Sequence, residues 1–369
     1  MKAISSGSMY EIFGDSLKTH DKLPTQTYVV RFSKSRGFFL EKYVDIEINE
    51  NKIYGVHLNK IHKVLRSFDN FNRNLGVILS GDKGIGKSLF AKLLAIEAMK
   101  KGIPLIVVDT YVPGIASYIE SIDQEVMVLF DEFDKTFGEV KQSDGEASPQ
   151  AHLLSLFDGV SGGKKLFVIT CNDLHKLNDY LINRPGRFHY HFRFEYPSAQ
   201  EVSEYLKDKL SEEQYGEIDD VVAFSRKINL NYDCLRAIAF EINMGSKFKE
   251  AIKDLNIVNT NSERYNVTLH FSNGVTATAK REHIDLFAED NIETLYLEDK
   301  SGRNFVDVTF NTSDCEFDTQ KMMNVVYPEN LIIKFDDDYY KDLVEQVKNA
   351  EVEYLSFTRV RERRLHYAV

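Results

Sequence analysis

The sequence predicts an α/β fold in which helices cover both faces of a parallel β-sheet. Four short apolar runs lack alternation of apolar and polar residues, as expected of strands that are buried on both faces. Helix-like stretches such as Ser88–Lys101 separate these runs, and the alternation of strands and helices implies βαβ units in a doubly wound sheet. A glycine-rich loop joins the first run to the first of these helices. The four runs are Gly76–Ser80, Ile103–Val108, Val126–Phe130 and Leu166–Thr170.

The segments on either side of this core predict three further parts. β-formers alternate over residues 26–48, which predicts a β-hairpin before the core. Apolar residues recur at helical spacing between residues 199 and 243 and predict a small helical unit. Alternation then returns in Asn266–Phe271 and Phe305–Phe310, as expected of a β-rich α+β domain. The expected parts are an N-terminal β segment (1–48), the αβα core (49–197), a helical lid (198–257) and a C-terminal β-rich domain (258–369).

The composition is that of an ordinary globular protein. Hydrophobic residues make up 43% and charged residues 28% of the 369 residues, which argues against a disordered or fibrous chain. The formal net charge of −11 argues against a surface that binds nucleic acid over most of its area. Cys171, Cys234 and Cys315 lack metal-binding spacing and predict free thiols in a reducing compartment. No apolar run approaches the ~18 residues of a membrane span, so we expect a cytoplasmic protein with no membrane partner.

The glycine-rich loop Gly81–Ser88 has the spacing of a phosphate-binding loop, Gly-x-x-x-x-Gly-Lys-Ser. Glycines let backbone N–H groups wrap the phosphates of a nucleotide, and the N-terminus of the following helix adds the positive end of its dipole. Lys87 is expected to reach the β- and γ-phosphates, and the Ser88 hydroxyl to coordinate Mg²⁺. The motif therefore predicts that ATP and Mg²⁺ bind at Asp82, Lys83, Gly84, Ile85, Gly86, Lys87, Ser88 and Leu89.

An acidic pair, Asp131 and Glu132, directly follows the apolar run Val126–Phe130. An acidic pair at a strand end can simply be a solvated terminus. Behind a phosphate-binding loop it has the arrangement of a Walker B motif, because the intervening chain is long enough for one crossover, a strand and a second crossover. We therefore expect Asp131 to join Ser88 in the Mg²⁺ shell, and Glu132 to polarise the water that attacks the γ-phosphate.

Two further motifs follow the last apolar run. This run ends in Cys171-Asn172, and Asn183-Arg184-Pro185-Gly186-Arg187-Phe188 comes shortly after. Together with the loop and the acidic pair, over about residues 46–245, they resemble the AAA+ ATPases, and within them the classical clade with an Arg-Pro-Gly-Arg-Phe signature. The resemblance implies a P-loop core with a helical lid that hydrolyses ATP. It also implies that Asn172 is sensor 1, which helps to place the attacking water; the alternative is an asparagine that only ends a strand.

The same resemblance implies an assembly of several copies. Arg184 and Arg187 correspond to the arginine-finger pair, which in this family reaches the ATP of the neighbouring subunit and stabilises charge in the transition state. The family most often forms hexameric rings, so we expect a ring of this chain. The alternative is that both arginines are surface residues beside a Pro-Gly turn.

Three other positions have weaker counterparts in the family. Arg236 is similar to the sensor 2 arginine of the lid, or is a salt-bridged helix residue. Ile53-Tyr54-Gly55 occupies the place where family members contact adenine. Tyr111-Val112-Pro113-Gly114 is similar to the aromatic pore loop that grips a substrate in the ring channel, with Tyr118 as a second candidate. Because this loop follows its strand closely and contains a proline, a structural turn is the alternative.

These observations leave three functions open. The first is a ring ATPase that remodels or translocates a macromolecular client, most simply a protein. The second keeps the ATPase but directs it to nucleic acid, as in replication or helicase-loading relatives; the four arginines of residues 359–364 favour it and the acidic net charge opposes it. The third is a scaffold that binds ATP to assemble and hydrolyses little of it.

Overall fold

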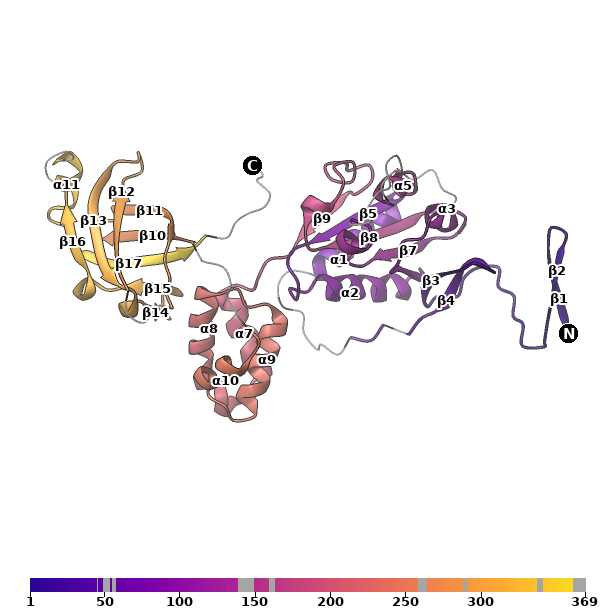
Figure 1. Ribbon diagram of the computed structural model, residues 1–369, viewed down its shortest axis with the longest axis horizontal. Coiled ribbons are helices and arrows are strands. Elements are labelled where there is room, and N and C mark those ends of the chain that lie inside the picture. The colour runs from indigo at the N-terminus through magenta and orange to yellow at the C-terminus, as the bar shows by residue number, and fades with distance from the viewer. Residues whose placement is uncertain are drawn as a thin grey trace. The chain divides into compact units, whose positions relative to one another are not determined.

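The computed structural model describes residues 1–44, 46–48, 54, 58–138, 149–158, 163–257, 264–287, 291–336 and 341–360. These residues form two compact units, Met1–Glu195 and Tyr196–Val369 (Figure 1). The first unit has a parallel-sheet core with helices, and the second has helices followed by an antiparallel sheet, so the predicted fold class is confirmed. Within the described ranges, every helix is too short or too polar to cross a bilayer.

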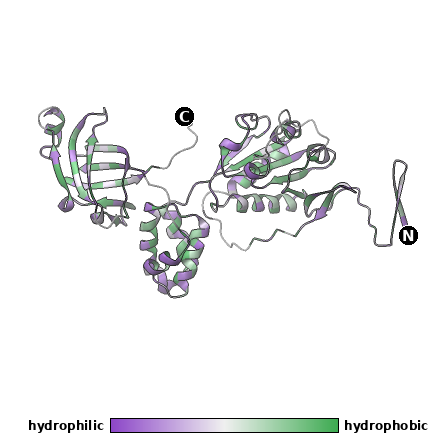
Figure 2. Cartoon of the chain, viewed as in Figure 1, coloured by the Kyte–Doolittle hydropathy of each residue, from purple (hydrophilic) through white to green (hydrophobic). Residues whose placement is uncertain are grey.

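The sheet of the first unit has seven strands in the order β4-β3-β6-β7-β8-β5-β9. All neighbouring strands are parallel except the hairpin pair β3–β4. Every residue of β5, β7 and β8 is buried, which explains why their sequences are continuously apolar. Figure 2 shows these inner strands largely in the hydrophobic colour. The bounds are β3 (Thr27–Ser33), β4 (Gly37–Lys42), β5 (Leu75–Ser80), β6 (Leu105–Val108), β7 (Val126–Phe130), β8 (Lys165–Cys171) and β9 (Tyr190–Arg193).

Helices of the first unit connect these strands. The longest, α2, begins at Lys87 directly after the glycine-rich loop and buries Phe90, Leu94 and Ala98 against the sheet. Phe90 also packs edge-on against Phe192, with ring centroids 5.7 Å apart, and so holds the start of α2 close to the end of β9. The helices are α1 (Leu58–Asn70), α2 (Lys87–Lys100), α3 (Ile115–Glu120), α4 (Phe133–Thr136), α5 (Pro149–His152), α6 (Leu154–Asp158) and the 3₁₀ helix η1 (Leu174–Lys176).

The hairpin β3–β4 extends the core sheet, which corrects the expected boundary at residue 48. Thr27–Val29 pair in parallel with Leu105–Val107 of β6, and Tyr28, Val29 and Val30 are buried. The sequence pattern identified two strands, but the partner of a strand depends on residues distant in the chain. A separate hairpin precedes them, formed by β1 (Lys2–Ser6) and β2 (Met9–Phe13).

The second unit begins with a helical part. Ser198 starts α7 with a capping box, because its side chain accepts from the Glu201 amide while the Glu201 carboxylate accepts from the Ser198 amide. Apolar faces of α7, α8 and α9 pack together, burying Val202, Leu206 and Val221. The helices are α7 (Ala199–Lys209), the 3₁₀ helix η2 (Glu212–Glu217), α8 (Ile218–Lys227), α9 (Tyr232–Asn243) and α10 (Phe248–Asp254).

An antiparallel sheet of eight strands follows, in the order β14-β15-β17-β10-β11-β12-β13-β16. Alternate residues of β10 are buried, which accounts for its alternating sequence. The Tyr265 hydroxyl donates to the Lys227 carbonyl of α8 at 3.4 Å, so the helical and β-rich parts contact each other. The elements are β10 (Arg264–Phe271), β11 (Thr276–His283), β12 (Ile292–Glu298), β13 (Asn304–Asn311), η3 (Thr312–Asp314), β14 (Glu316–Asp318), β15 (Met323–Val326), η4 (Pro328–Asn330), β16 (Ile332–Phe335), α11 (Lys341–Val347) and β17 (Val352–Arg359).

Candidate active site

The polar motifs meet at one edge of the first unit's sheet. Strands β5, β8 and β7 are neighbours and run in parallel, so the segments that follow them emerge side by side. After β5 comes the glycine-rich loop, after β7 the acidic pair and after β8 Asn172. The connection that follows β5 leads to β6, on the β8 side of β5, whereas β9 lies on the opposite side of β5. Ligands of open α/β sheets bind at such a switch point.

The glycine-rich loop uses backbone conformations that favour glycine. Gly81, Gly84 and Gly86 have φ values of 142°, 73° and 98°. A Cβ atom on Gly81 would lie 2.4 Å from the Phe194 carbonyl oxygen, so only glycine lets the loop pass this close to the segment after β9. Gly86 caps α2, and its carbonyl accepts from the Phe90 amide at 2.9 Å. The loop therefore ends at the N-terminus of a long helix, where the dipole favours an anion.

The ammonium group of Lys87 lies inside this loop. The residue is 6% exposed, and its Nζ donates to the Gly81 carbonyl at 2.7 Å and to the Asp82 carbonyl. Burial lowers the pKa of Lys87, while nearby acidic groups that include Asp134 and Asp131 act in the opposite direction. The positive charge is thus held among backbone carbonyls at the centre of the loop.

Ser88 and Asp131 lie close together, as the sequence predicted. The Ser88 hydroxyl is 3.4 Å from the Asp131 Oδ1 atom, although the two residues belong to different strand–helix units. Mg²⁺ prefers hydroxyl and carboxylate oxygens about 2.1 Å from the ion, so two oxygens at this separation can face one cation. Asp131 is fixed by a second hydroxyl, that of Thr170, which donates to the same Oδ1 atom at 2.6 Å.

Glu132 occupies the turn after β7 in a conformation that is uncommon for a residue with a side chain. Its φ is 49°, in the left-handed region, and its carboxylate is exposed. An ion pair with Lys135 is the main reason that the pKa of Glu132 is lowered, and Lys83 and Asn172 add smaller contributions. The carboxylate is therefore ionised at neutral pH.

Two further residues at this edge were assigned no role by sequence reasoning, although Asp134 lies at the end of the motif that begins at Val126. Asp134, which is 2% exposed, accepts from the backbone amides of Asn172 and Asp173, both at 3.1 Å. Thr170 bonds to Asp131 and also accepts from the Glu132 amide at 2.8 Å. A carboxylate one turn after the acidic pair was the only sequence signal for Asp134. Thr170 gave none, because a threonine is ordinary at the end of a strand.

The two predicted finger arginines lie in different environments. Arg184 is exposed, and its guanidinium lies over the Tyr180 ring at 5.7 Å. Arg187 is 8% exposed; it forms a two-point ion pair with Asp158 and donates to the Tyr180 carbonyl at 2.7 Å. This differs from the expectation that both arginines project toward a neighbouring subunit, because the guanidinium of Arg187 is occupied within its own chain.

The loop after β6 is tied to the core rather than projecting freely. Tyr111, the predicted pore-loop aromatic, is half-buried and packs edge-on against Phe137 at 5.8 Å. Tyr118 stacks on Phe38 of the hairpin at 5.2 Å. This packing is what a structural turn would show.

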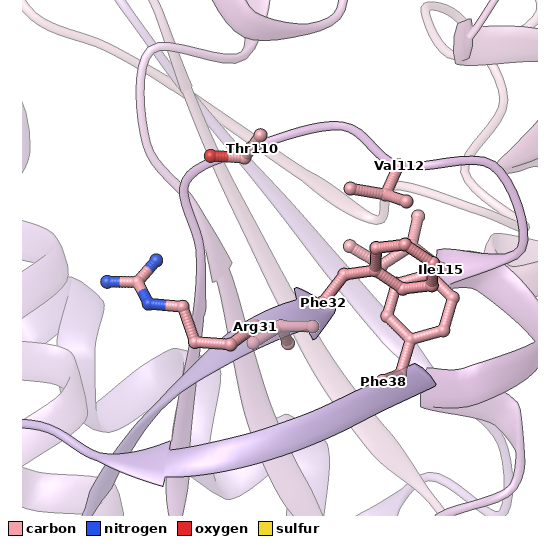
Figure 3. Close-up of a pocket in the computed structure, with 7 residues that line it drawn as sticks. Arg31, Phe32, Phe38, Thr110, Val112 and Ile115 are labelled. Carbon is pink, nitrogen blue, oxygen red and sulfur yellow. The ribbon is translucent and has the colours of Figure 1, made fainter. Parts of the chain in front are cut away.

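A pocket of about 190 Å³ adjoins this loop. In Figure 3 the side chains of Phe32, Phe38 and Ile115 gather on one side of it, near Val112, while the Arg31 guanidinium points away from them. Arg31 forms an ion pair with Asp109 at 2.9 Å. The pocket wall is thus mainly apolar, and the charged groups stand at its margin. The lining residues are Val30, Arg31, Phe32, Phe38, Thr110, Val112 and Ile115.

The remaining predicted positions belong to other segments of the chain. Arg236 belongs to α9 of the second unit, where its guanidinium is 3.5 Å from the Asp233 carboxylate, so a lid role for it stays a prediction. Tyr54 is buried at 9% exposure, and its neighbours Ile53 and Gly55 fall outside the described residues. Residues 361–364 of the arginine-rich tail also fall outside them. Arg359 donates to the Asn229 side chain at 3.0 Å.

Comparison with known proteins agrees with this arrangement. The profile of the family described as "ATPase family associated with various cellular activities (AAA)" matches residues 77–196. Two similar proteins, both named proteasome-associated ATPase, come from Mycolicibacterium vanbaalenii and Mycolicibacterium smegmatis. They are 28% and 27% identical over 254 residues, which is 58% of this chain and 41% of each relative. A protein of the same name from Nocardia farcinica is 29% identical over 253 residues, 57% of this chain and 43% of the relative.

The chain therefore covers less than half the length of these relatives. The matched segment begins within β5 and ends at residue 196. It therefore contains the ends of β5, β7 and β8, which contribute the residues of the site. Residues 77–196 match the AAA ATPase family, and this match, together with the parallel sheet, the glycine-rich loop and the acidic pair, confirms the family resemblance that the sequence predicted.

Proposed function

We propose that this chain binds ATP with Mg²⁺, hydrolyses it to ADP and phosphate, and uses the hydrolysis to remodel or translocate a protein substrate in the cytoplasm. One observation carries the proposal: Lys87, Ser88, Asp131, Glu132 and Asn172 come from three strand ends and meet around one helix N-terminus. The match of residues 77–196 to an ATPase family supports the same conclusion.

The proposed role of each residue follows from its position. Loop amides and Lys87 hold the phosphates of ATP, and Ser88 with Asp131 holds Mg²⁺. When bound, the ion neutralises charge that develops on the phosphates. Glu132 accepts a proton from the attacking water, and Asn172, whose side chain contributes to the lowered pKa of Glu132, helps to orient that water. Water then attacks in line, and the bond to the γ-phosphate breaks with ADP as the leaving group.

We further propose that the active unit is a ring, hexameric as in most of the family, in which each ATP lies next to a neighbouring copy. Arg184 is exposed and would supply positive charge to the neighbour's ATP, as arginine fingers do. Arg187, which is bound to Asp158, would fix the loop that carries Arg184. Gly76 of β5 supports such a fixed position, because a Cβ atom there would lie 2.3 Å from the Arg187 carbonyl oxygen.

A protein client is favoured over nucleic acid. The relatives are named for their association with the proteasome, which supports a protein substrate for the shared ATPase segment. The net charge of −11 opposes non-specific contact with nucleic acid phosphates. The hairpin β3–β4 and the β-rich part of the second unit lie outside the matched family segment, and we propose that they help to select the client.

Phosphate release from ATP and Mg²⁺ tests the hydrolysis directly. Lys87→Ala should lower the rate by about 100-fold or more, because it removes the charge that holds the phosphates. Lys100→Ala changes an exposed lysine at the other end of α2 and should behave as wild type. If Lys87→Ala hydrolyses ATP as fast as the Lys100→Ala control, the proposed site is wrong.

Glu132→Gln separates an ATPase from an assembly scaffold. The variant should still bind ATP, since the loop and Lys87 are intact, but it should release phosphate at least about 100-fold more slowly. A ring that hydrolyses ATP would therefore be trapped in its ATP-bound state. If the wild-type protein assembles with ATP and the variant has the same small hydrolysis rate, the scaffold is the correct function.

A further inference from the structure

Two buried polar side chains connect the ends of β7 and β8 without belonging to any proposed nucleotide contact. Thr170 is 1% exposed and Asp134 is 2% exposed. Each comes from one strand end and forms hydrogen bonds with the other. Because buried polar groups are costly unless they are paired, such contacts specify one relative position of the two segments.

Thr170 acts from β8 on the segment after β7. Its hydroxyl donates to Asp131 Oδ1 at 2.6 Å and accepts from the Glu132 amide at 2.8 Å. One hydroxyl thus orients the carboxylate that faces Ser88 and also holds the amide of the turn at Glu132. That turn has φ of 49°, a conformation that costs on the order of 1 kcal/mol for a residue with a Cβ atom and persists only when its surroundings enforce it.

Asp134 acts in the reverse direction, from the segment after β7 on the end of β8. Its two carboxylate oxygens accept separately from the amides of Asn172 and Asp173, each at 3.1 Å. Holding these two consecutive amides fixes the backbone of Asn172. The Asn172 side chain is thereby held on the side of Glu132, where it contributes to lowering the pKa of that carboxylate.

We infer that Thr170 and Asp134 form a reciprocal clamp that sets Glu132 and Asn172 in register for the attack of water. The inference rests on the proposed ATPase function and deepens it. Both are positioning residues, since they act through Asp131, Glu132 and Asn172. Loss of the clamp should slow the chemical step, whereas ATP binding by the loop should change little. Loss of Thr170 should in addition weaken the apparent affinity for Mg²⁺, because the Asp131 carboxylate loses the hydroxyl that orients it.

Turnover measurements on matched variants test whether the chemical step slows while ATP binding stays unchanged. Thr170→Val removes the hydroxyl at nearly constant volume and should lower kcat by about 10–100-fold, the usual effect of removing an orienting partner. The KM for ATP should stay close to wild type, and the Mg²⁺ concentration for half-maximal rate should rise. Thr170→Ser keeps the hydroxyl and should restore most of kcat. Thr27→Val, which removes another buried hydroxyl from the same sheet, is the control and should leave kcat unchanged.

Amide hydrogen exchange tests the clamp independently of ATP hydrolysis. In Asp134→Asn one carboxylate oxygen becomes an amide group that cannot accept, so exchange at Asn172 or Asp173 should accelerate. In Thr170→Val, exchange of the Glu132 amide hydrogen should accelerate. Melting temperatures of both variants show whether they fold. Unchanged exchange at these amides would overturn the clamp, as would wild-type kcat in both variants. If the wild-type protein fails to hydrolyse ATP, the proposed function is wrong. The exchange rates still show whether the clamp exists in that case.

Discussion

At the scale of single residues, the site depends on charges that are held close to one another in a partly buried setting. Lys87 is buried among carbonyl groups, and Asp131 is oriented by the hydroxyl of Thr170. The opposite charges at these strand ends partly compensate for the cost of burying them. A phosphate group that enters the loop would add further negative charge beside Lys87. The loop is therefore built to favour an anionic ligand.

His191 of β9 should make the stability of the first unit depend on pH. Burial, with a contribution from Arg193, lowers the pKa of His191 to about 4, and its Nε2 atom is 2.7 Å from the Ser80 hydroxyl. Between pH 6.5 and 4 the unfolded chain then binds a proton that the folded chain does not. The free energy of unfolding should fall over this range as the pH is lowered, by on the order of 2–3 kcal/mol from this group.

Urea unfolding at several pH values measures this effect. His191→Gln removes the titrating group while keeping a hydrogen-bonding side chain, so its unfolding free energy should depend less on pH than that of wild type. His175→Gln, at an exposed histidine of the same unit, controls for the loss of a histidine. Identical pH dependence in wild type and His191→Gln would show that His191 does not titrate in this way.

Residues with a motif signature could be predicted from the sequence, and residues that only support them could not. The positions of Lys87 and Ser88 at the start of a helix were predictable, because the motif has a fixed spacing of glycines before that helix. Thr170 and Asp134 were not, since their contacts depend on the neighbouring positions of β7 and β8 in the sheet. Arg187 was predicted by its motif, but its pairing with Asp158 depends on where α6 ends.

At the scale of elements, the hairpin β3–β4 is an integral part of the sheet edge. Phe38 stacks on Tyr118 of α3 and lies 5.0 Å from the Phe32 ring. Phe38→Ala should therefore lower the free energy of unfolding by about 2 kcal/mol, less than for a fully buried phenylalanine. Phe39→Ala, on the opposite face of β4, is the matched control and should cost less than about 1 kcal/mol. Equal losses in urea unfolding would mean that the hairpin does not pack on α3 as described.

Local pattern predicted strands where burial was complete or where it alternated regularly along the strand. The runs that became β5, β7 and β8 are apolar throughout because both of their faces are covered. Strand β9 was missed, because its four residues, Tyr190–Arg193, are only partly buried or exposed and carry no apolar run. The hairpin was predicted as strands, but its parallel pairing with β6 is a long-range contact that local alternation does not encode.

At the scale of the whole molecule, the chain combines a parallel-sheet unit that carries the candidate nucleotide site with a second unit of helices and antiparallel strands. The alternating sequence after residue 264 predicted its β-rich character. The contact between Tyr265 of β10 and Lys227 of α8 was not predictable, because it joins two parts that the sequence pattern had separated. These parts form one compact unit.

The central claim is that two copies of the chain share each hydrolytic site. Lys87→Ala should abolish phosphate binding in its own loop, while Arg184→Ala should remove the charge that this account assigns to the neighbour's site. Each variant alone should therefore be inactive, with Arg184→Ala reduced by about 10³-fold or more. In an equal mixture that assembles at random, about a quarter of the interfaces would pair an intact loop with an intact Arg184.

Phosphate release by this mixture is the most direct measurement of that claim. The account predicts that mixing the two inactive variants restores a substantial fraction of the wild-type rate, and that activity rises with protein concentration as copies assemble. A mixture of Lys87→Ala with Glu132→Gln should stay inactive, because both substitutions damage the same half of the site. If the Lys87→Ala and Arg184→Ala mixture is no more active than its separate components, the hydrolytic site is not shared between copies.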